Sequence, residues 1–441
     1  MKKQIKVIPR TLPGFMELKP NEQILFNQIK EKIEGSYKRF GFLPLDTPIL
    51  ELSEVLLAKA GGETEKQIYR FTRGDDLAMR FDLTVPLAKY VSKNYGELQF
   101  PFRRYQIGKV YRGERPQKGR FREFYQADID IIGDGELSIM NDAEIPSIIY
   151  TTFKSLGFDD FTIRINNRKI LNGLFKYLNI VELSTEIMRI IDKLEKIGKE
   201  NVKLELLKLN IKEEIVDKIL EFISISGNNE EKIEALEKLN IKNEVFEKGL
   251  FELKEVVKYI RLFGVPEENF SIDLTIARGL DYYTGTVYET FLDNYREIGS
   301  VCSGGRYDNL AENYTDKSLP GVGIAIGVTR LFDQLNDLKL IKTEKESISD
   351  VLVISTSDDV SECLPIANTF RKEGINTEVY MNDKKMKAKF KYADKLKIPY
   401  VAIIGEDELK ENKVSLKNLI TGKQDTINIQ EAVEILKEYN K

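Results

Sequence analysis

Two strand-like runs joined by a short turn, between residues 99 and 133, constrain the fold of this chain more than any other stretch. The first run is QFPFRRYQIGKVYRGE, the turn is RPQKG, and the second run is RFREFYQADIDIIG. Runs rich in aromatic and β-branched residues that are bounded by Pro and Gly are typical of strands. The sequence therefore predicts a strand, a loop and a second strand in direct succession.

The second predicted strand carries an unusual polar face. Phe124, Gln126, Asp128 and Asp130 have the same parity, so a strand places their side chains on one side. Two acids and an amide next to each other are costly if they are buried without partners. This pattern favours a face that lines a polar site.

The loop between the two runs is rich in cations and aromatic rings. Within residues 114–126, cations alternate with rings: Arg115, Lys118, Arg120 and Arg122 with Phe121, Phe124 and Tyr125. A solvated charged face is the ordinary interpretation of a charge run, although such a face rarely has interleaved rings. These residues alone leave both interpretations open.

The absence of histidine limits the chemistry. The chain has 441 residues, with 67 Lys and Arg, 71 Asp and Glu, and no histidine. This excludes Ser-His-Asp and Cys-His nucleophile systems, histidine general bases and most zinc sites. Arginine, lysine, carboxylates, tyrosine and backbone amides remain, and they suit phosphate chemistry, where charge stabilisation and positioning dominate. Codon bias is the favoured cause of the absence itself.

The order of patterns along the chain predicts two to four domains. Residues 21–40 have helical spacing of apolar residues, and 41–50 form an extended segment that contains two prolines. A helical insertion is predicted over 170–262, after which strand-like sequence returns at 271–290. A buried strand that runs into a helix is expected at 321–335.

The C-terminal part has a different pattern. Residues 336–349 are predicted to be a linker, and 350–441 a separate α/β domain with a mainly parallel sheet, because strands alternate with helices. One predicted helix, 384–397, contains seven lysines. A surface helix and a nucleic-acid contact are equally good interpretations of this helix.

A cytoplasmic protein is expected from the remaining features. No apolar run is long enough to cross a bilayer, and the N-terminus lacks the pattern of a signal peptide. Cys302 and Cys363 lie far apart and fit no metal-binding spacing, which favours a reducing compartment.

Taken together, these stretches resemble class II aminoacyl-tRNA synthetases, and among them the histidine-specific family. FGFLPLDTPILE at 40–51 is similar to the first class motif, a dimer-interface element, with Pro48 as its proline. VYRGERPQKGRFREFYQADIDIIG at 110–133 is similar to the second, and GVGIAIGVTRLF at 321–332 to the third. ARGLDYYTGTVYE at 277–289 resembles the signature of the histidine-specific enzymes. RFDLTVPLAKY at 80–90 and the YQADIDIIG wording look more like the archaeal and eukaryotic branch.

The resemblance implies a fold and a domain order. A catalytic α+β domain over 1–335, built on an antiparallel sheet and interrupted by the helical insertion, would precede the linker. Residues 350–441 would be the anticodon-binding domain. The implied partners are histidine, ATP with Mg²⁺ bound mainly through its phosphates, tRNA(His), and a second copy of the chain; no membrane and no metal held by protein ligands are implied.

The resemblance also assigns residues to ATP. Arg112 would bind the α-phosphate together with the carboxylate of the amino acid, and Arg120 would reach the outer phosphates. Glu114 would hold the adenine amino group, while Phe124 and Arg330 would stack on ATP. Arg278 would approach the α-phosphate from the opposite side as a fixed cation, so Arg112 and Arg278 are the catalytic candidates.

For histidine, the resemblance assigns an ammonium subsite and a ring subsite. Asp82, Thr84 and Gln126 would accept the ammonium group, and Asp130 with Tyr283, next to Tyr282, would read the imidazole ring; Arg112 and Arg278 complete this set. Asp128 receives no role and is expected to be an ordinary carboxylate. Thr329 departs from the family pattern, which has glutamate before Arg330, and this puts the role of that glutamate in doubt.

Three rival interpretations share the same fold. One is the synthetase-like regulatory subunit of the first enzyme of histidine biosynthesis, which typically lacks the C-terminal domain and has eroded ATP motifs. A second is a synthetase-like sensor of uncharged tRNA, which should also show eroded arginines. A third is another class II synthetase, against which the RGLDYY sequence argues.

Overall fold

The computed structural model describes residues 7–58, 65–71, 76–276, 282–341, 346–357 and 359–439. These form two compact units, one of Met1–Met16 with Ile29–Leu338 and one of Glu17–Gln28 with Lys339–Lys441. No helix in the described ranges is long and apolar enough to span a membrane.

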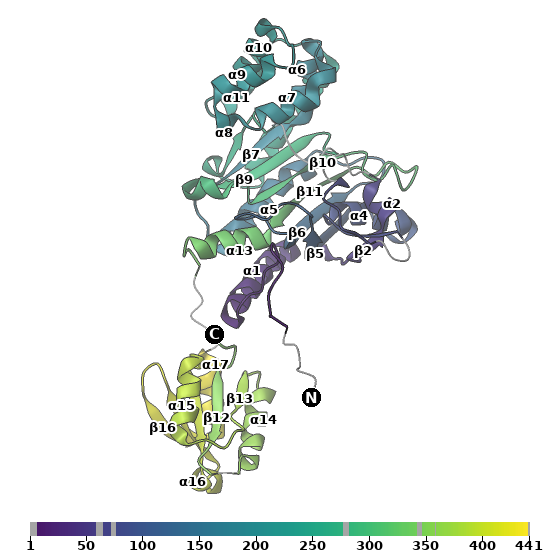
Figure 1. Cartoon of the computed structure of the whole chain (residues 1–441). Helices are drawn as coiled ribbons and strands as arrows, with labels where there is room; N and C mark the ends of the chain where they lie inside the picture. Colours follow the sequence, from purple (N-terminus) through teal and green to yellow (C-terminus); the bar gives the residue numbers. More distant parts are fainter. Residues whose placement is uncertain are drawn as a thin grey trace. The chain divides into compact units, whose positions relative to one another are not determined.

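The first unit is built on an eight-stranded sheet (Figure 1). Its order is β1 (Leu43–Pro44), β5 (Phe102–Tyr111), β6 (Glu123–Ile132), β11 (Gly321–Gly327), β10 (Cys302–Tyr307), β9 (Thr286–Leu292), β7 (Phe161–Asn167) and β8 (Phe270–Ile272). The five inner pairings are antiparallel, and only the edge pairs β1–β5 and β7–β8 are parallel. The predicted α+β fold on an antiparallel sheet is confirmed.

The predicted strand–loop–strand forms the centre of this sheet. β5 and β6 pair along ten residues each, from Phe102 opposite Ile132 to Tyr111 opposite Glu123. The loop between them turns through an isolated bridge of Gln117 with Arg120, where Gly119 has a φ of +69°. A left-handed φ favours glycine because it has no Cβ. The hairpin therefore fixes which side chains of β6 share a face.

Helices and a small sheet complete the unit around this hairpin. α5 (Met140–Leu156) contacts β11, and α13 (Val328–Asp337) contacts β6. Near the end of α1 (Pro20–Arg39), the buried Tyr37 hydroxyl donates to the carbonyl of Ala127 on β6. A three-stranded antiparallel sheet, β2 (Leu50–Leu52), β4 (Leu77–Met79) and β3 (Arg70–Phe71), leads into α4 (Thr84–Lys93).

A helical segment separates β7 from β8, drawn in teal in Figure 1. It comprises α6 (Arg168–Tyr177), α7 (Ser184–Ile191), α8 (Leu194–Ile197), α9 (Lys199–Leu207), α10 (Glu213–Ile223), α11 (Asn229–Lys238) and α12 (Glu244–Leu262). Gly173 of α6 lies so close to α12 that a Cβ would stand 2.6 Å from Phe246. This close approach packs α6 and α12, and α12 also contacts α5 and β7.

The second unit contains a five-stranded sheet in the order β13 (Thr377–Val379), β12 (Val351–Ser355), β14 (Tyr400–Ile404), β15 (Lys413–Asn418) and β16 (Gln424–Asn428). The expectation of a mainly parallel sheet was wrong, because β14–β15 and β15–β16 are antiparallel. β16 is largely exposed and polar, so its sequence lacks the apolar pattern by which strands are predicted. The helices are α14 (Leu364–Lys372), α15 (Met386–Lys395), α16 (Glu406–Lys410) and α17 (Ile429–Tyr439).

Candidate active site

The polar face of β6 meets matching positions on its two neighbours. Across β5, Gln126, Asp128 and Asp130 lie opposite Gly108, Gln106 and Arg104, and across β11 they lie opposite Gly327, Ala325 and Gly323. The β11 residues are small, which leaves room above the sheet. A Cβ on Gly323 would stand 2.4 Å from Oδ1 of Asp130, so only glycine fits beside this carboxylate.

Three carboxylates are buried together at this face. Asp82, from the turn before α4, joins Asp128 and Asp130, and each is about 2% exposed. Burial raises the pKa of Asp82 to about 6 and that of Asp130 to about 6, and it also raises the pKa of Asp128 well above its ordinary value, because an ionised carboxylate loses its hydration there. The expectation that Asp128 is an ordinary carboxylate was wrong.

Several acceptors at this face have no hydrogen-bond partner among the described residues. Asp82 accepts from the backbone N–H of Val85 through Oδ1 at 3.1 Å, but its Oδ2 has no such partner. Gln126 Oε1 and Asp128 Oδ1 are also buried without one. Buried acceptors normally have donors. This face is therefore suited to a ligand that brings positive charge and N–H groups.

Asp130 differs from its neighbours because two groups already contact it. The Tyr307 hydroxyl donates to Oδ1 at 2.5 Å. Nη2 of Arg104 lies 2.6 Å from Oδ2, an ion pair that is not aligned as a hydrogen bond. Each carboxylate oxygen has a second lone pair, so Asp130 can still accept from a ligand.

Tyr282 and Tyr283 lie beside the acidic face, which consists of Asp82, Gln126, Asp128 and Asp130. Their rings are 5.1 Å apart, and the ring of Tyr282 is 5.9 Å from that of Tyr307. Tyr282 is also next to the Thr84 hydroxyl. A Cβ on Gly305 would stand 3.0 Å from the ring of Tyr283, so a second glycine, opposite Gly323 in the β10–β11 pair, makes room for a site residue.

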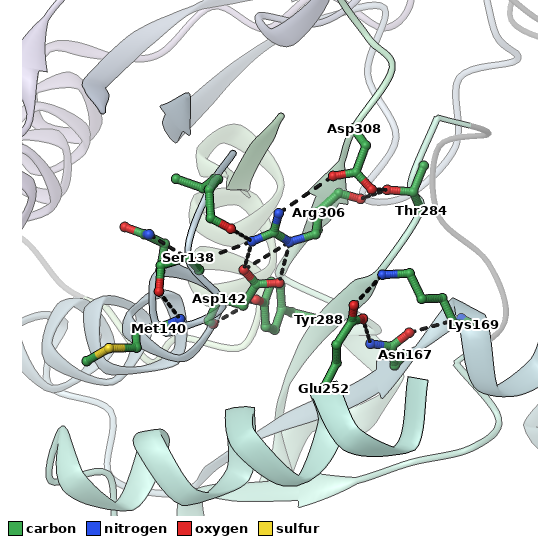
Figure 2. Close-up of polar contacts among 12 residues, drawn as sticks. Ser138, Met140, Asp142, Asn167, Lys169, Glu252, Thr284, Tyr288, Arg306 and Asp308 are labelled. Carbon is green, nitrogen blue, oxygen red and sulfur yellow. Dashed lines mark hydrogen bonds and ion pairs between the residues drawn. The ribbon is translucent and has the colours of Figure 1, made fainter. Parts of the chain in front are cut away.

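The segment after Tyr283 is fastened by a polar network, shown in Figure 2. The Thr284 hydroxyl donates to Asp308 Oδ2 at 2.6 Å, and its N–H donates to the carbonyl of Arg306 at 2.8 Å. Arg306 makes a buried bidentate ion pair with Asp142 of α5, from Nε to Oδ1 at 3.0 Å and from Nη2 to Oδ2 at 2.7 Å. The Tyr288 hydroxyl donates to the carbonyl of Asp142. The sheet and α5 thus fix the position of this segment.

The cations expected to bind ATP lie at the end of the hairpin. Arg112 directly follows β5; its Nε donates to the carbonyl of Phe81 at 3.0 Å, and its guanidinium lies 5.2 Å from the ring centre of Phe124. Arg120, about half exposed, pairs with Glu114 at 3.2 Å. The expected residues of the second motif are therefore brought together.

Arg330, at the start of α13, lies near this loop. Its Nη2 donates to the carbonyl of Ile298, and its Nε is buried without a hydrogen-bond partner among the described residues. Burial lowers the pKa of Arg330, and the positive charge of the nearby Arg120 acts in the same direction. Thr329 is buried, and its hydroxyl accepts from the N–H of Tyr125 at 2.8 Å. Thr329, which stands where the family pattern has glutamate, thus holds the β6 backbone beside Phe124.

Comparison with known proteins decides the family. The histidyl-tRNA synthetase family model matches residues 14–331, and the anticodon binding domain model matches residues 350–439. The chain belongs to the histidyl-tRNA synthetase family. Histidine–tRNA ligase from Clostridium tetani is 61% identical over 99% of this chain and all of its own length, and the one from Finegoldia magna is 51% identical over 97% and 99%.

Solved structures agree with this family. Histidyl-tRNA synthetase from Nostoc sp. PCC 7120 is 39% identical, with a TM-score of 0.90, covering 98% of this chain and all of that one. A Bacillus halodurans chain described as an ATP phosphoribosyltransferase regulatory subunit/histidyl-tRNA synthetase is 20% identical, with a TM-score of 0.75 over 91% and 99%, and shows the shared fold alone. The relatives named here are bacterial, so the likeness to the archaeal and eukaryotic branch gains no support.

The site in the structure differs from the one expected from the sequence by one residue that lies outside the described ranges and three that were not expected. Arg278 lies outside the described residues. The sequence did not assign Arg104, Asp128 or Tyr307 to the site. Arg104 and Gln106 are two residues apart on β5, as Asp128 and Asp130 are on β6, and they lie directly opposite those two acids. The signal existed, but it becomes visible only when the register of the two strands is known. In the described ranges, no three acidic or cysteine side chains are grouped as a metal site.

Proposed function

We propose that the chain is a histidine–tRNA ligase, which joins histidine to ATP as histidyl-adenylate, releases pyrophosphate, and transfers histidine to the 3′ end of tRNA(His). The observation that carries this is the position of Arg112. It lies between the acidic face, where burial raises the pKa of Asp82 and Arg112 opposes that rise, and the ring of Phe124. A cation at this junction neutralises the amino-acid carboxylate and the α-phosphate, two anions that must meet.

The acidic face is the proposed histidine site. The α-ammonium group lies against Asp82 and Gln126, whose unpartnered oxygens suit its N–H groups, with Thr84 beside them. Asp130 and Tyr283 read the imidazole ring, and the buried Oδ1 of Asp128 offers the ligand a further acceptor. The buried oxygens of Asp82, Gln126 and Asp128 that lack a partner among the described residues support this division.

The hairpin end is the proposed ATP site. Adenine stacks between Phe124 and Arg330, with Glu114 at its amino group, and Arg120 turns from Glu114 to the outer phosphates. ATP enters as its Mg²⁺ complex, with the ion held mainly by phosphate oxygens. Arg278 stays a prediction as the second catalytic cation.

Amino-acid-dependent exchange of pyrophosphate into ATP tests the function. We expect exchange with histidine and with none of the other nineteen amino acids. The three rivals predict otherwise: a regulatory subunit or a tRNA sensor gives no exchange, and another class II synthetase exchanges with a different amino acid. Absence of histidine-dependent exchange with fresh protein and Mg²⁺ would overturn the proposal.

A homodimer is proposed from an exposed apolar surface around the first motif. Leu43, on the edge strand β1, is 59% exposed, and four further large apolar side chains on or next to β2 and β3 are at least 40% exposed: Ile49, Leu50, Leu52 and Phe71. An open sheet edge with exposed apolar residues favours pairing with another chain. A monomeric mass in light scattering at micromolar concentration would contradict this.

The second unit is the proposed tRNA-binding domain. α15 and its flanks expose Lys384, Lys385, Lys387, Lys391, Lys395 and Lys397. Lys389 is different, because it is buried and its Nζ donates to the carbonyl of Ser355 at 2.8 Å. It supports its own domain and is not a contact candidate. The cytoplasm is the proposed compartment, consistent with the unpaired, buried Cys302 and Cys363.

A further inference from the structure

Arg104 is a fully buried arginine whose contacts do not explain its presence as a structural residue. Its Nη2 pairs with Asp130 at 2.6 Å and donates to the carbonyl of Leu83 at 3.0 Å. Its Nε and Nη1 have no hydrogen-bond partner among the described residues. A buried ion pair with incomplete hydrogen bonding is often less stable than apolar residues of the same volume. Stability alone therefore gives no reason to keep arginine here.

The two contacts of Arg104 reach the two halves of the proposed histidine site. Leu83 lies between Asp82 and Thr84, which belong to the ammonium subsite, whereas Asp130 belongs to the ring subsite. A single nitrogen, Nη2, contacts both. The planar guanidinium, locked inside the core, therefore fixes the distance between the two subsites.

Resting on the proposed function, we propose that Arg104 is a positioning residue for histidine. It sets the spacing between the segment 82–84 and Asp130, and it keeps the Asp130 carboxylate ionised, so that this carboxylate accepts the imidazole N–H. Arg104 itself does not touch the substrate in this arrangement. It acts through the two groups that do.

The electrostatics of Asp130 agree with this role. The titratable and charged groups around it are Arg104 from β5, Tyr307 from β10, Asp128 from its own strand, Asp82 from the turn before α4, Tyr37 from α1, and Tyr283. Burial raises the pKa of Asp130, and Arg104 opposes this rise more than any other group. Without Arg104 the carboxyl is protonated at higher pH. A protonated carboxyl then donates where the ring requires an acceptor.

The test replaces Arg104 with Gln and follows pyrophosphate exchange. We expect the KM for histidine to rise by about tenfold or more, because the hydrogen bond from the imidazole to the charged Asp130 is weakened or lost. The KM for ATP should stay within about twofold of the wild type. The acidic limb of kcat/KM for histidine should move up by about one pH unit or more, because a cation within a few ångströms lowers a carboxyl pKa by that amount. The titration of histidine itself is the same in every variant.

The neighbouring Arg103→Gln is the matched control. Arg103 also pairs with an acid, Glu144 at 2.9 Å, and also donates to a carbonyl, that of Phe40, but it lies on the other face of β5. It should leave the histidine KM and the acidic limb unchanged. If Arg104→Gln behaves in the same way while both proteins are active, Arg104 is structural and the inference is wrong.

Arg104→Lys separates the two parts of the role because it keeps the charge and removes the planar guanidinium. We expect the acidic limb to stay near its wild-type position while the histidine KM rises, since an ammonium cannot span Leu83 and Asp130 as a guanidinium does. An unchanged KM would overturn the spacing role, even if Arg104→Gln fails to fold. Absence of exchange by the wild type would instead refute the proposed function, and histidine binding by calorimetry would still test Arg104.

Discussion

At the scale of single residues, the site concentrates carboxyl groups where water is excluded. Three buried carboxylates face one fully buried guanidinium, with Arg112 at the border of the group. Such an excess of acid is unfavourable in the free protein and becomes favourable when a cationic ligand enters. The acidic face thus favours histidine with its α-ammonium group over neutral ligands of the same shape.

Asp130→Asn tests how the ring is read. Asparagine keeps the size but removes the charge and half of the acceptor capacity. We expect the KM for histidine to rise by about 10- to 100-fold, the range for a hydrogen bond to a charged group of about 1.5–3 kcal/mol, with the KM for ATP nearly unchanged. Exchange kinetics with histidine and with analogues that lack one ring nitrogen measure both effects. Unchanged KM and unchanged discrimination would show that the ring is read elsewhere.

The sequence predicted the shared face of Gln126 and Asp130 from parity alone, because a strand alternates its side chains whatever its neighbours are. It could not predict that Arg104 pairs with Asp130, or that Asp128 is buried. Those depend on strand register and on the small residues of β11, which belong to segments distant in the chain. Local periodicity has no information about either.

At the scale of elements, the first unit positions its site with the β5–β6 hairpin and the fastened segment after Tyr283. The β5–β6 hairpin was predictable because its strands are contiguous in sequence and its turn contains Pro and Gly. The fastening of the segment after Tyr283 was not, because Thr284, Asp308 and Asp142 come from three separate elements. The Thr284 hydroxyl on Asp308 and the Thr284 N–H on the carbonyl of Arg306 hold the segment, and Nη1 of Arg168 donates to the carbonyl of Tyr283 at 2.9 Å.

Thr284→Val tests this fastening. The change keeps the shape and removes the hydroxyl that donates to Asp308. Because Tyr283 is the adjacent residue, we expect the histidine KM to rise by about five- to thirtyfold, corresponding to about 1–2 kcal/mol for a lost hydrogen bond. Thr284→Ser should restore it.

Thr162→Val is the control for Thr284→Val. Thr162 donates to Asp293 at 2.8 Å in a similar threonine–aspartate pair on β7, outside the proposed site. Both changes should lower the melting temperature to a similar extent, but only the first should raise the histidine KM. Equal kinetics in the two variants would show that Thr284 contributes stability alone.

At the scale of the whole molecule, the chain divides its tasks between two units that match separate family models. The α/β character of the C-terminal part was predictable from its alternation of strands and helices. The antiparallel strands β15 and β16 were not, because exposed polar strands lack an apolar period. Chemistry and tRNA selection are therefore expected to respond to different substitutions.

The triple substitution of Lys387, Lys391 and Lys395 by Gln on α15 tests this division. These lysines are exposed and have no ion pair among the described residues, so they remain available for phosphates.

A triple change of Lys410, Lys423 and Lys437 removes the same charge from the same domain, but these lysines pair with Glu406, Asp425 and Glu373. We expect only the α15 variant to weaken tRNA(His) binding, with the slope of log affinity against log salt reduced by about 0.7–0.9 for each lost phosphate contact. Pyrophosphate exchange should be unchanged in both variants, because it needs no tRNA. Equal tRNA affinities in the two variants, measured by filter binding over a salt series, would show that α15 is an ordinary solvated surface and that tRNA binds elsewhere.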